Sequence, residues 1–470
     1  MTHLDDALAA RSWEAIARIA AAHVSMLADV GVLESGGHAS LMSALDGVGR
    51  GAAPASRLAD LVAAFDERTE GLSPPGIVGA ASVGRGAAEV VAAVIRLILR
   101  DDLLAVGAGL HRPRSSLLDL AGVHAVTTMP AYSGGDAAQP TTFGHFLGGL
   151  IGPLGRAAGQ LPRVYAMVDR SPLGAGTLAS TAIEIDRERQ AELLGFSSLL
   201  DNTFDAVAAV DHLVACANLA ETVATGIGRF LSELIAWLRI EPGAMLLSGD
   251  WTGHEPGLPQ LTPATGIIEL QEMVADVVVG ADAVRRLAAD APYAPITGLA
   301  DRALGLTSRC LTEVAALAQR TASLLTTGLT INRALLANRA GKGFSTVSDL
   351  GDFLTIEEGL EPAAARAIAA LTYRRAADEG LEASGITPEM IDGAALMVLG
   401  REVGVEFEAI SRYLAPRRFI ERRTVIGGPA PRALRDYLDR ERERLLADER
   451  WVAETRQMID DVFQRLDGPL

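Results

Sequence analysis

The sequence contains few of the residue types that mark several large classes of protein. Its 470 residues include two cysteines, and both Cys216 and Cys310 stand in apolar, helix-like segments without metal-ligand spacing. We therefore expect two buried thiols and no metal site. Lysine occurs once, at Lys342, so arginine carries nearly all of the positive charge. Aromatic residues make up only 4 % while hydrophobic residues reach 49 %, so the core must consist mainly of aliphatic side chains.

Charge and hydropathy exclude two classes of partner. The net charge of −17 argues against nucleic acid, because binding of phosphates requires a basic surface. No stretch approaches the roughly 20 uninterrupted apolar residues of a membrane span, and the first residues lack the basic and apolar segments of a signal peptide. Gly174 and Gly176 follow no recognisable strand, which excludes a dinucleotide-binding loop. We expect a cytoplasmic protein that binds a small molecule and needs no cofactor.

Alanine and leucine are abundant and favour helices, and the chain is too long for one compact core. The sequence predicts an all-α fold with three domains, at residues 1–78, 79–342 and 343–470. Long helices are expected at residues 87–111, 141–168, 202–239, 267–289, 303–340 and 432–466, and irregular loops at 129–140 and 241–266. Such helices need partners along their whole length. This favours a homo-oligomer, with a monomeric bundle as the alternative.

Three segments carry distinctive motifs. Residues 169–176 read DRSPLGAG and are followed by IDRE at 185–188, residues 132–145 read YSGGDAAQPTTFGH, and residues 422–431 read RRTVIGGPAP. These segments resemble the argininosuccinate lyase branch of the fumarase/aspartase superfamily. The first matches at the family's spacing, the second is similar to its tyrosine-threonine-histidine loop, which runs into alanine-glutamine-proline, and the third is similar to its small C-terminal domain.

The resemblance implies a fumarase/aspartase-like fold whose central bundle of long helices forms the core of a homotetramer. Each active site would be assembled from loops of three subunits. The family reaction is an elimination, in which a base removes a proton beside a carboxylate, an aci-carboxylate forms, and a C–N or C–O bond breaks to release fumarate. Such chemistry needs a base, an acid for the leaving group, and cations or helix N-termini that hold the developing negative charge.

The chain departs from the family at the positions that carry this chemistry. Residues 252–264, which match the mobile loop with the family's catalytic serine and lysine, read TGHEPGLPQLTPA. Because Lys342 is the only lysine, no alignment restores the family's lysine. The family's second loop matches residues 132–145, where Gly134 stands at its histidine. The family's arginine-rich first loop matches residues 81–88, where at most Arg85 survives. A buried dicarboxylate needs cationic partners, so we do not expect cleavage of argininosuccinate.

Four residues are candidates for catalysis. Glu255 could act as a base whose pKa rises when its loop closes, with His254 as an acid or orienting group. The alternative is two solvated residues on a loop rich in glycine and proline. Asp136 could act as a base or bind a cationic group, or it could cap the helix that follows Pro140. Tyr132 is the fourth candidate.

Further residues are candidates for binding the substrate: Ser133, Gln139, Arg85, Asn202 and Tyr293. In the family, the residue at Gln139 is largely structural. Arg170 and Arg187 match family arginines beside the glycine loop, which is the segment of residues 171–176. Ion pairs between subunits are the expected role of these two arginines, and anion binding is the alternative.

Three hypotheses for the function follow. In the first, a repurposed lyase catalyses a different elimination or addition on a small biosynthetic intermediate in specialised metabolism. In the second, the chain is a catalytically silent homologue that acts as a scaffold or binding subunit beside an active paralogue. In the third, the chain is an unrelated helical oligomer. The polar residues kept at 132–139 and the position of Glu255 favour the first.

Overall fold

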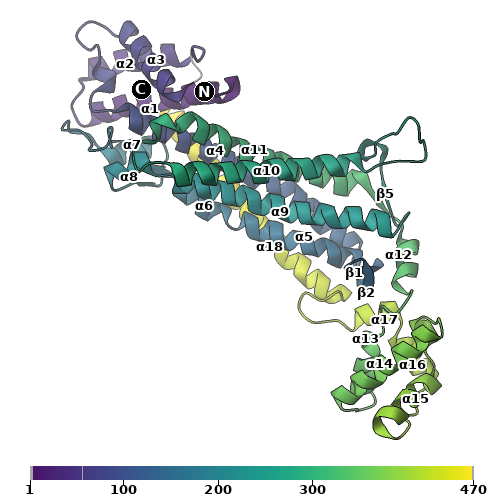
Figure 1. Ribbon diagram of the computed structural model, residues 1–470. Coiled ribbons are helices and arrows are strands. Elements are labelled where there is room, and N and C mark those ends of the chain that lie inside the picture. Colours follow the sequence, from purple (N-terminus) through teal and green to yellow (C-terminus); the bar gives the residue numbers. More distant parts are fainter. Residues whose placement is uncertain (1–3, 55–56, 468–470) are drawn as a thin grey trace.

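The structure is a computed structural model that describes residues 4–54 and 57–467. Nearly all of the chain is helical, and its longest helices run side by side through an elongated body (Figure 1). One end carries three helices, α1 (Asp6–Asp29), α2 (Ser35–Gly49) and α3 (Leu58–Leu72), which share a continuous hydrophobic core with the bundle. The expected all-α, multi-domain architecture is confirmed.

The bundle is built from long helices that pack lengthwise, and its strongest pairings join α4 to α11 and α9 to α10. Its helices are α4 (Ala87–Val123), α5 (Phe143–Ala158), α6 (Leu161–Val168), α9 (Asp211–Ile240), α10 (Thr265–Asp290) and α11 (Ala300–Ser323). Two short helices, α7 (Arg187–Leu193) and α8 (Thr203–Ala208), lie at the end near α1 (Figure 1). No helix among the described residues is long and apolar enough to cross a membrane.

The small helices of the C-terminal region have a hydrophobic core of their own, which includes Leu350, Ile368 and Ile410. They are α13 (Ser348–Ile356), α14 (Pro362–Asp378), α15 (Pro388–Leu399), α16 (Phe407–Tyr413) and α17 (Pro416–Glu421). Helix α12 (Arg333–Ala340) connects them to the end of the bundle that lies opposite α1 (Figure 1). The last helix, α18 (Pro431–Asp467), returns and packs against α4 and α5.

Side chains fix several helix starts. Asp5 Oδ1 accepts a hydrogen bond from Leu8 N at 2.8 Å, and Thr142 Oγ1 accepts one from His145 N at 3.1 Å. These bonds satisfy backbone donors that have no partner inside the first turn. Thr142, rather than Asp136, therefore caps α5.

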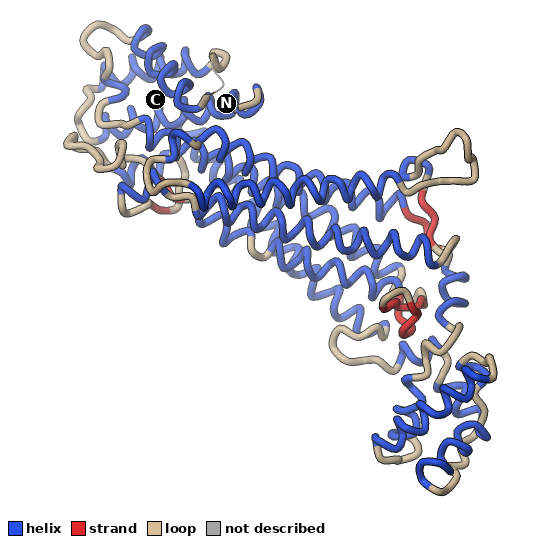
Figure 2. The backbone as a smooth tube through the Cα atoms, in the orientation of Figure 1, coloured by secondary structure: helices blue, strands red, loops and turns tan. Residues whose placement is uncertain are grey.

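The expected loop at residues 129–140 is instead an antiparallel hairpin of β1 (Thr128–Ser133) and β2 (Asp136–Thr142) (Figure 2). Gly134 and Gly135 form its two-residue turn with φ of 64° and 96°. Such turns require positive φ at both central residues, which glycine adopts without strain. The Gly-Gly pair therefore indicates a hairpin, whereas the hydrophobic periodicity of the surrounding residues does not.

Three helices predicted as continuous are interrupted. The one expected at 141–168 begins only after β2 and divides into α5 and α6 at Gly159 and Gln160. The one expected at 202–239 breaks at Ala209, whose backbone is extended, before α9 begins. The one expected at 303–340 ends after α11 in a wide turn and a strand, β6 (Leu329–Ile331), which pairs with β5 (Met245–Leu247). Gly328 lies against the ring of Trp251 there. Packing and strand pairing, rather than low helix propensity, therefore end the helix.

Candidate active site

The candidate residues lie at opposite ends of the bundle. Tyr132, Ser133, Asp136 and Gln139 belong to the β1–β2 hairpin, and the loop after β5 that carries His254 and Glu255 projects from the same end (Figure 1). Arg85, Asn202 and Tyr293 lie at the other end, near α1, α8 and the short turn of helix η3 (Ile296–Gly298).

The Tyr132 phenol is held by groups of its own chain. Its hydroxyl donates to Glu241 Oε1 at 2.5 Å, and Glu241 also pairs with Arg339 at 2.8 Å. Burial raises the pKa of Tyr132 above its usual value, and the hydrogen bond to Glu241 and the charge of Glu241 raise it further. Its ring packs edge-on against Trp237. Tyr132 thus ties the hairpin to the ends of α9 and α12.

The tip of the hairpin presents free polar groups. Ser133 and Asp136 are exposed, and neither side chain has a hydrogen bond or ion pair within the described part of the chain. Gln139 Nε2 donates to Ser348 Oγ at 3.3 Å. This contact joins the hairpin to the first helix of the C-terminal core, which agrees with a structural role for Gln139.

The loop of residues 252–264 also presents free polar groups. His254 and Glu255 are both exposed, and within residues 4–54 and 57–467 their side chains make no hydrogen bond or ion pair. A turn in which Leu258 N donates to Glu255 O at 3.0 Å follows, and Gly253 N donates to Pro263 O at 2.8 Å. The loop is therefore closed at its base and open at its tip.

The side chain of Arg85, at the opposite end, binds a carboxylate of its own chain. Its side chain is 2 % exposed and is hydrogen-bonded and ion-paired with Asp66. Glu89, four residues later, accepts from Gly86 N at 3.0 Å and from Gly176 N at 2.6 Å. Burial raises the pKa of this carboxyl, and the two backbone donors lower it. The remnant of the first family loop is thus locked onto the glycine loop.

Gly86 makes this close approach possible. A Cβ there would lie 2.6 Å from the carbonyl carbon of Gly176 and 2.9 Å from Thr177 N, both backbone atoms that cannot move aside cheaply. We expect Gly86→Ala to destabilise the protein by about 1–3 kcal/mol, measured as the urea midpoint at fixed protein concentration. Gly36→Ala is the control, since nothing lies within 4 Å of its Cβ position. Equal midpoints for the two variants would contradict the close contact.

Asn202, Arg187 and Tyr293 surround α8. Asn202 Oδ1 accepts from Phe204 N at 2.9 Å and so caps that helix. Arg187 donates to the carbonyls of Leu173 and Leu200, both at 2.8 Å. These carbonyls give Arg187 a role within its own chain, and its expected ion pair between subunits stays a prediction. Arg170 is exposed.

A buried histidine holds the loop that carries Arg85. His23 Nε2 donates to Val83 O at 2.8 Å, and its Nδ1 accepts from Gln190 Nε2 at 2.5 Å. Burial, followed by the charge of Arg85, lowers the pKa of His23 to about 4. Sequence reasoning missed this residue, because its partners lie 60 and 167 positions away.

His23 links stability to pH. An unfolded histidine has a pKa of about 6.5, so the unfolded state binds the extra proton first, and stability is lost as the pH falls from about 6.5 towards 4. The full change corresponds to about 3 kcal/mol. We expect the stability difference between the wild type and His23→Asn to be largest above pH 6.5 and to shrink on acidification, as followed by urea titrations. A difference independent of pH would contradict the assignment.

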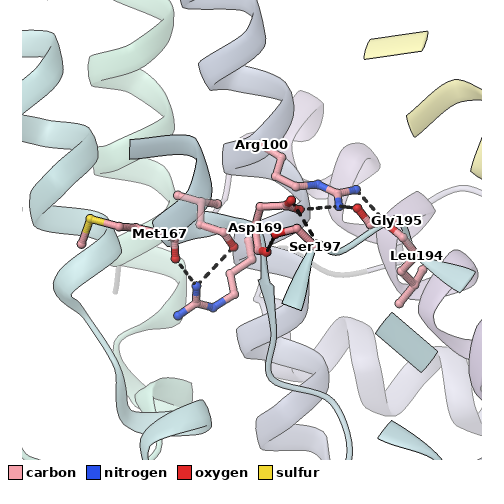
Figure 3. A network of polar contacts seen from close by, with 8 residues as sticks. Arg100, Met167, Asp169, Leu194, Gly195 and Ser197 are labelled. Atoms are coloured by element: carbon pink, nitrogen blue, oxygen red, sulfur yellow. Dashed lines mark hydrogen bonds and ion pairs between the residues drawn. The ribbon is translucent and has the colours of Figure 1, made fainter. Parts of the chain in front are cut away.

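A buried polar network lies behind the segment of residues 169–176 (Figure 3). Arg100 donates to Asp169 Oδ1 at 3.0 Å and to the carbonyls of Gly195 at 2.9 Å and Leu194 at 3.1 Å. Ser197 Oγ donates to Asp169 O at 2.9 Å. The network fixes the start of residues 169–176 against the helix–turn segment near α7.

One chain cannot bring both groups of candidates together. The 37 residues of α4 span about 55 Å at 1.5 Å per residue, and the two groups lie at opposite ends of this bundle (Figure 1). Reacting groups must approach to about 3 Å. A site that used both groups would therefore need a second chain packed in the reverse direction.

Comparisons with known proteins agree with this architecture. Residues 44–248 match the lyase family. The argininosuccinate lyase of Methanosarcina acetivorans is 31 % identical over 82 % of this chain and 77 % of its own length. That of Natronomonas pharaonis is 31 % identical over 95 % and 89 %. The crystal structure of an EDDS lyase in complex with formate has a TM-score of 0.84 at 24 % identity, covering 98 % of this chain and 91 % of that one.

The fold is that of the fumarase/aspartase-type lyases. With the sequence relatives, this places the chain in the fumarase/aspartase superfamily as an argininosuccinate lyase-like member, and thus among enzymes of the lyase type. The match spans nearly the whole chain, which excludes an unrelated helical oligomer.

Proposed function

We propose that this protein is a repurposed lyase that catalyses an elimination or addition, of the C–N or C–O type, on a small biosynthetic intermediate other than argininosuccinate. Glu255 would be the base and His254 the acid or orienting group, with Asp136 as a second carboxylate and Tyr132 positioning the hairpin. The supporting observation is that His254, Glu255, Ser133 and Asp136 are exposed and unpaired within the described residues, all at one end of the bundle.

Changes at the family's cation positions support a different substrate. Gly134 replaces the loop histidine, and residues 252–264 contain no lysine. The Arg85 side chain is only 2 % exposed and pairs with Asp66 through Nη2. A dicarboxylate would therefore lack partners for its negative charges. Relatives of one fold also bear different substrate names, argininosuccinate lyase and EDDS lyase, which agrees with loop changes altering the substrate on a common scaffold.

We further propose a homotetramer whose antiparallel chains bring unlike ends together. Bundle helices with exposed apolar residues such as Ile268 and Val279 would be covered in such an assembly. Sedimentation equilibrium is expected to give the mass of four chains. A stable monomer would contradict the shared site, because the candidate residues of one chain stand about a bundle length apart.

The proposal is tested by two assays on the purified protein. Argininosuccinate is expected to release no fumarate, followed by the ultraviolet absorbance of fumarate. A panel of small unsaturated acids with amines or alcohols, read by mass spectrometry, is expected to yield an adduct in the addition direction. Fumarate release from argininosuccinate would contradict the altered specificity. An oligomer that turns over nothing in a broad panel would favour the alternative, a silent subunit that binds or scaffolds.

A further inference from the structure

Two aromatic rings are stacked on the surface at the α8 end of the bundle. The Phe204 and Tyr293 rings lie 5.4 Å apart at 16°, and the Tyr293 hydroxyl lies 3.5 Å from Asp205 Oδ1. Phe204 is 38 % and Tyr293 70 % exposed. Phe204, Asp205 and Tyr293 form what we call the aromatic-carboxylate shelf. Large exposed rings beside a carboxylate are unusual in a chain with only 4 % aromatic residues.

The shelf is held beside the remnant of the first family loop. A small apolar cluster with Ala88, Ala175 and Val207 packs α8 against the start of α4 and against the glycine loop. The η3 turn, three residues beyond Tyr293, also packs against α4. The shelf is therefore exposed to solvent but held in place by elements that pack against α4.

Three arginines at this end of the bundle are bound by other groups. Arg85 is paired with Asp66, and Arg187 is bound by carbonyl oxygens. Arg96, which is fully buried, donates to the carbonyls of Met167 at 2.9 Å and Val168 at 3.2 Å. These guanidinium groups hold the fold. The charges of Arg96 and Asp205 act on each other at a distance, but Asp205 makes no direct ion pair with an arginine among the described residues. A ligand cation could therefore contact its carboxylate directly.

We propose that the shelf binds a positively charged, planar or amine-bearing group of the substrate. The electron-rich ring faces attract cations, and Asp205 supplies the opposite charge and a hydrogen-bond acceptor. The inference rests on the proposed function, because it assigns a positive charge to one end of that reaction's substrate. Such a shelf would prefer cations, whereas a site for dicarboxylates would prefer anions.

Three probes of equal shape and different charge test the shelf: benzamidinium, neutral benzamide and benzoate. Binding to the full-length protein is measured by ligand-observed NMR titration. We expect benzamidinium to bind about tenfold more tightly than benzamide and benzoate to bind most weakly. Benzoate binding as tightly as benzamidinium would overturn the proposal.

Variants distinguish binding at the shelf from a general attraction of cations to an acidic protein. Asp205→Asn and, independently, Tyr293→Leu are each expected to reduce the preference for benzamidinium over benzamide severalfold. Tyr293→Leu changes an exposed residue, so it tests the shelf even if Asp205→Asn fails to fold. Asp250→Asn, at the opposite end of the bundle, is the control and should leave the preference unchanged. Equal loss in the control and the shelf variants would overturn the proposal.

Turnover distinguishes this inference from the proposed function. Selective binding of benzamidinium with no turnover of any substrate would support cation binding at the shelf and contradict the proposed lyase function. Turnover that is insensitive to Asp205→Asn and Tyr293→Leu would leave the lyase function standing and remove the shelf from substrate recognition.

Discussion

Glu255→Gln is expected to lower turnover by about 100- to 10,000-fold, the range that a general base contributes. Glutamine keeps the size of the side chain and its place on the loop but cannot accept a proton at neutral pH. Because Glu255 is exposed and unpaired within the described residues, the substitution breaks no contact seen in the structure. The stability of the variant should therefore match the wild type.

The measurement is the initial rate on whichever unsaturated acid and nucleophile the screen identifies. Glu358→Gln, an exposed glutamate of the C-terminal region, is the matched control and should keep full activity. Unchanged turnover in Glu255→Gln would remove Glu255 from the mechanism.

Arg100→Met is expected to destabilise the protein by about 3–5 kcal/mol, as when one partner of a buried ion pair is removed. The Arg100 side chain is 1 % exposed, and methionine would leave the carboxylate of Asp169 and the carbonyls of Leu194 and Gly195 without its guanidinium. Burial raises the pKa of Asp169 and Arg100 lowers it, so the variant should also bind an extra proton more readily.

The control is Arg50→Met, which removes an exposed pair with Asp46 one helical turn away. Exposed pairs contribute about 0.2–1 kcal/mol, so its urea midpoint should stay close to the wild type at the same protein concentration. Adding Asp169→Asn to Arg100→Met should recover part of the loss, because no unpaired charge then remains. Similar losses for Arg50→Met and Arg100→Met would contradict the role of the buried network.

The long helices could be predicted well because their signal is local. Residues 267–289 and 432–466 were expected to be helical, and α10 and α18 cover 265–290 and 431–467. Apolar periodicity and the absence of proline within these two stretches are enough to predict such helices. The predictions failed where distant partners compete with propensity, as at β6, whose strand depends on pairing with β5 more than 80 residues earlier.

The candidate site was only partly visible in the sequence. Motif spacing selected the hairpin, the loop of residues 252–264 and the segment after Asp169. It did not reveal that Glu241 binds Tyr132 or that His23 and Glu89 hold the first loop. These residues carry no motif, and their roles depend on contacts between elements that are remote in the chain. Phe204 likewise gained its partner only through the approach of Tyr293 to α8.

The sequence by itself determined the helical class, the family resemblance and the loss of the family's lysine and loop histidine, because these follow from composition, periodicity and residue identity at fixed spacing. Only the tertiary structure decided which arginines are free, since a guanidinium becomes unavailable when folding places a carbonyl or carboxylate beside it. It also decided that the candidate residues lie at opposite ends of one bundle. Rigid helices of this length cannot bend back on themselves to join them.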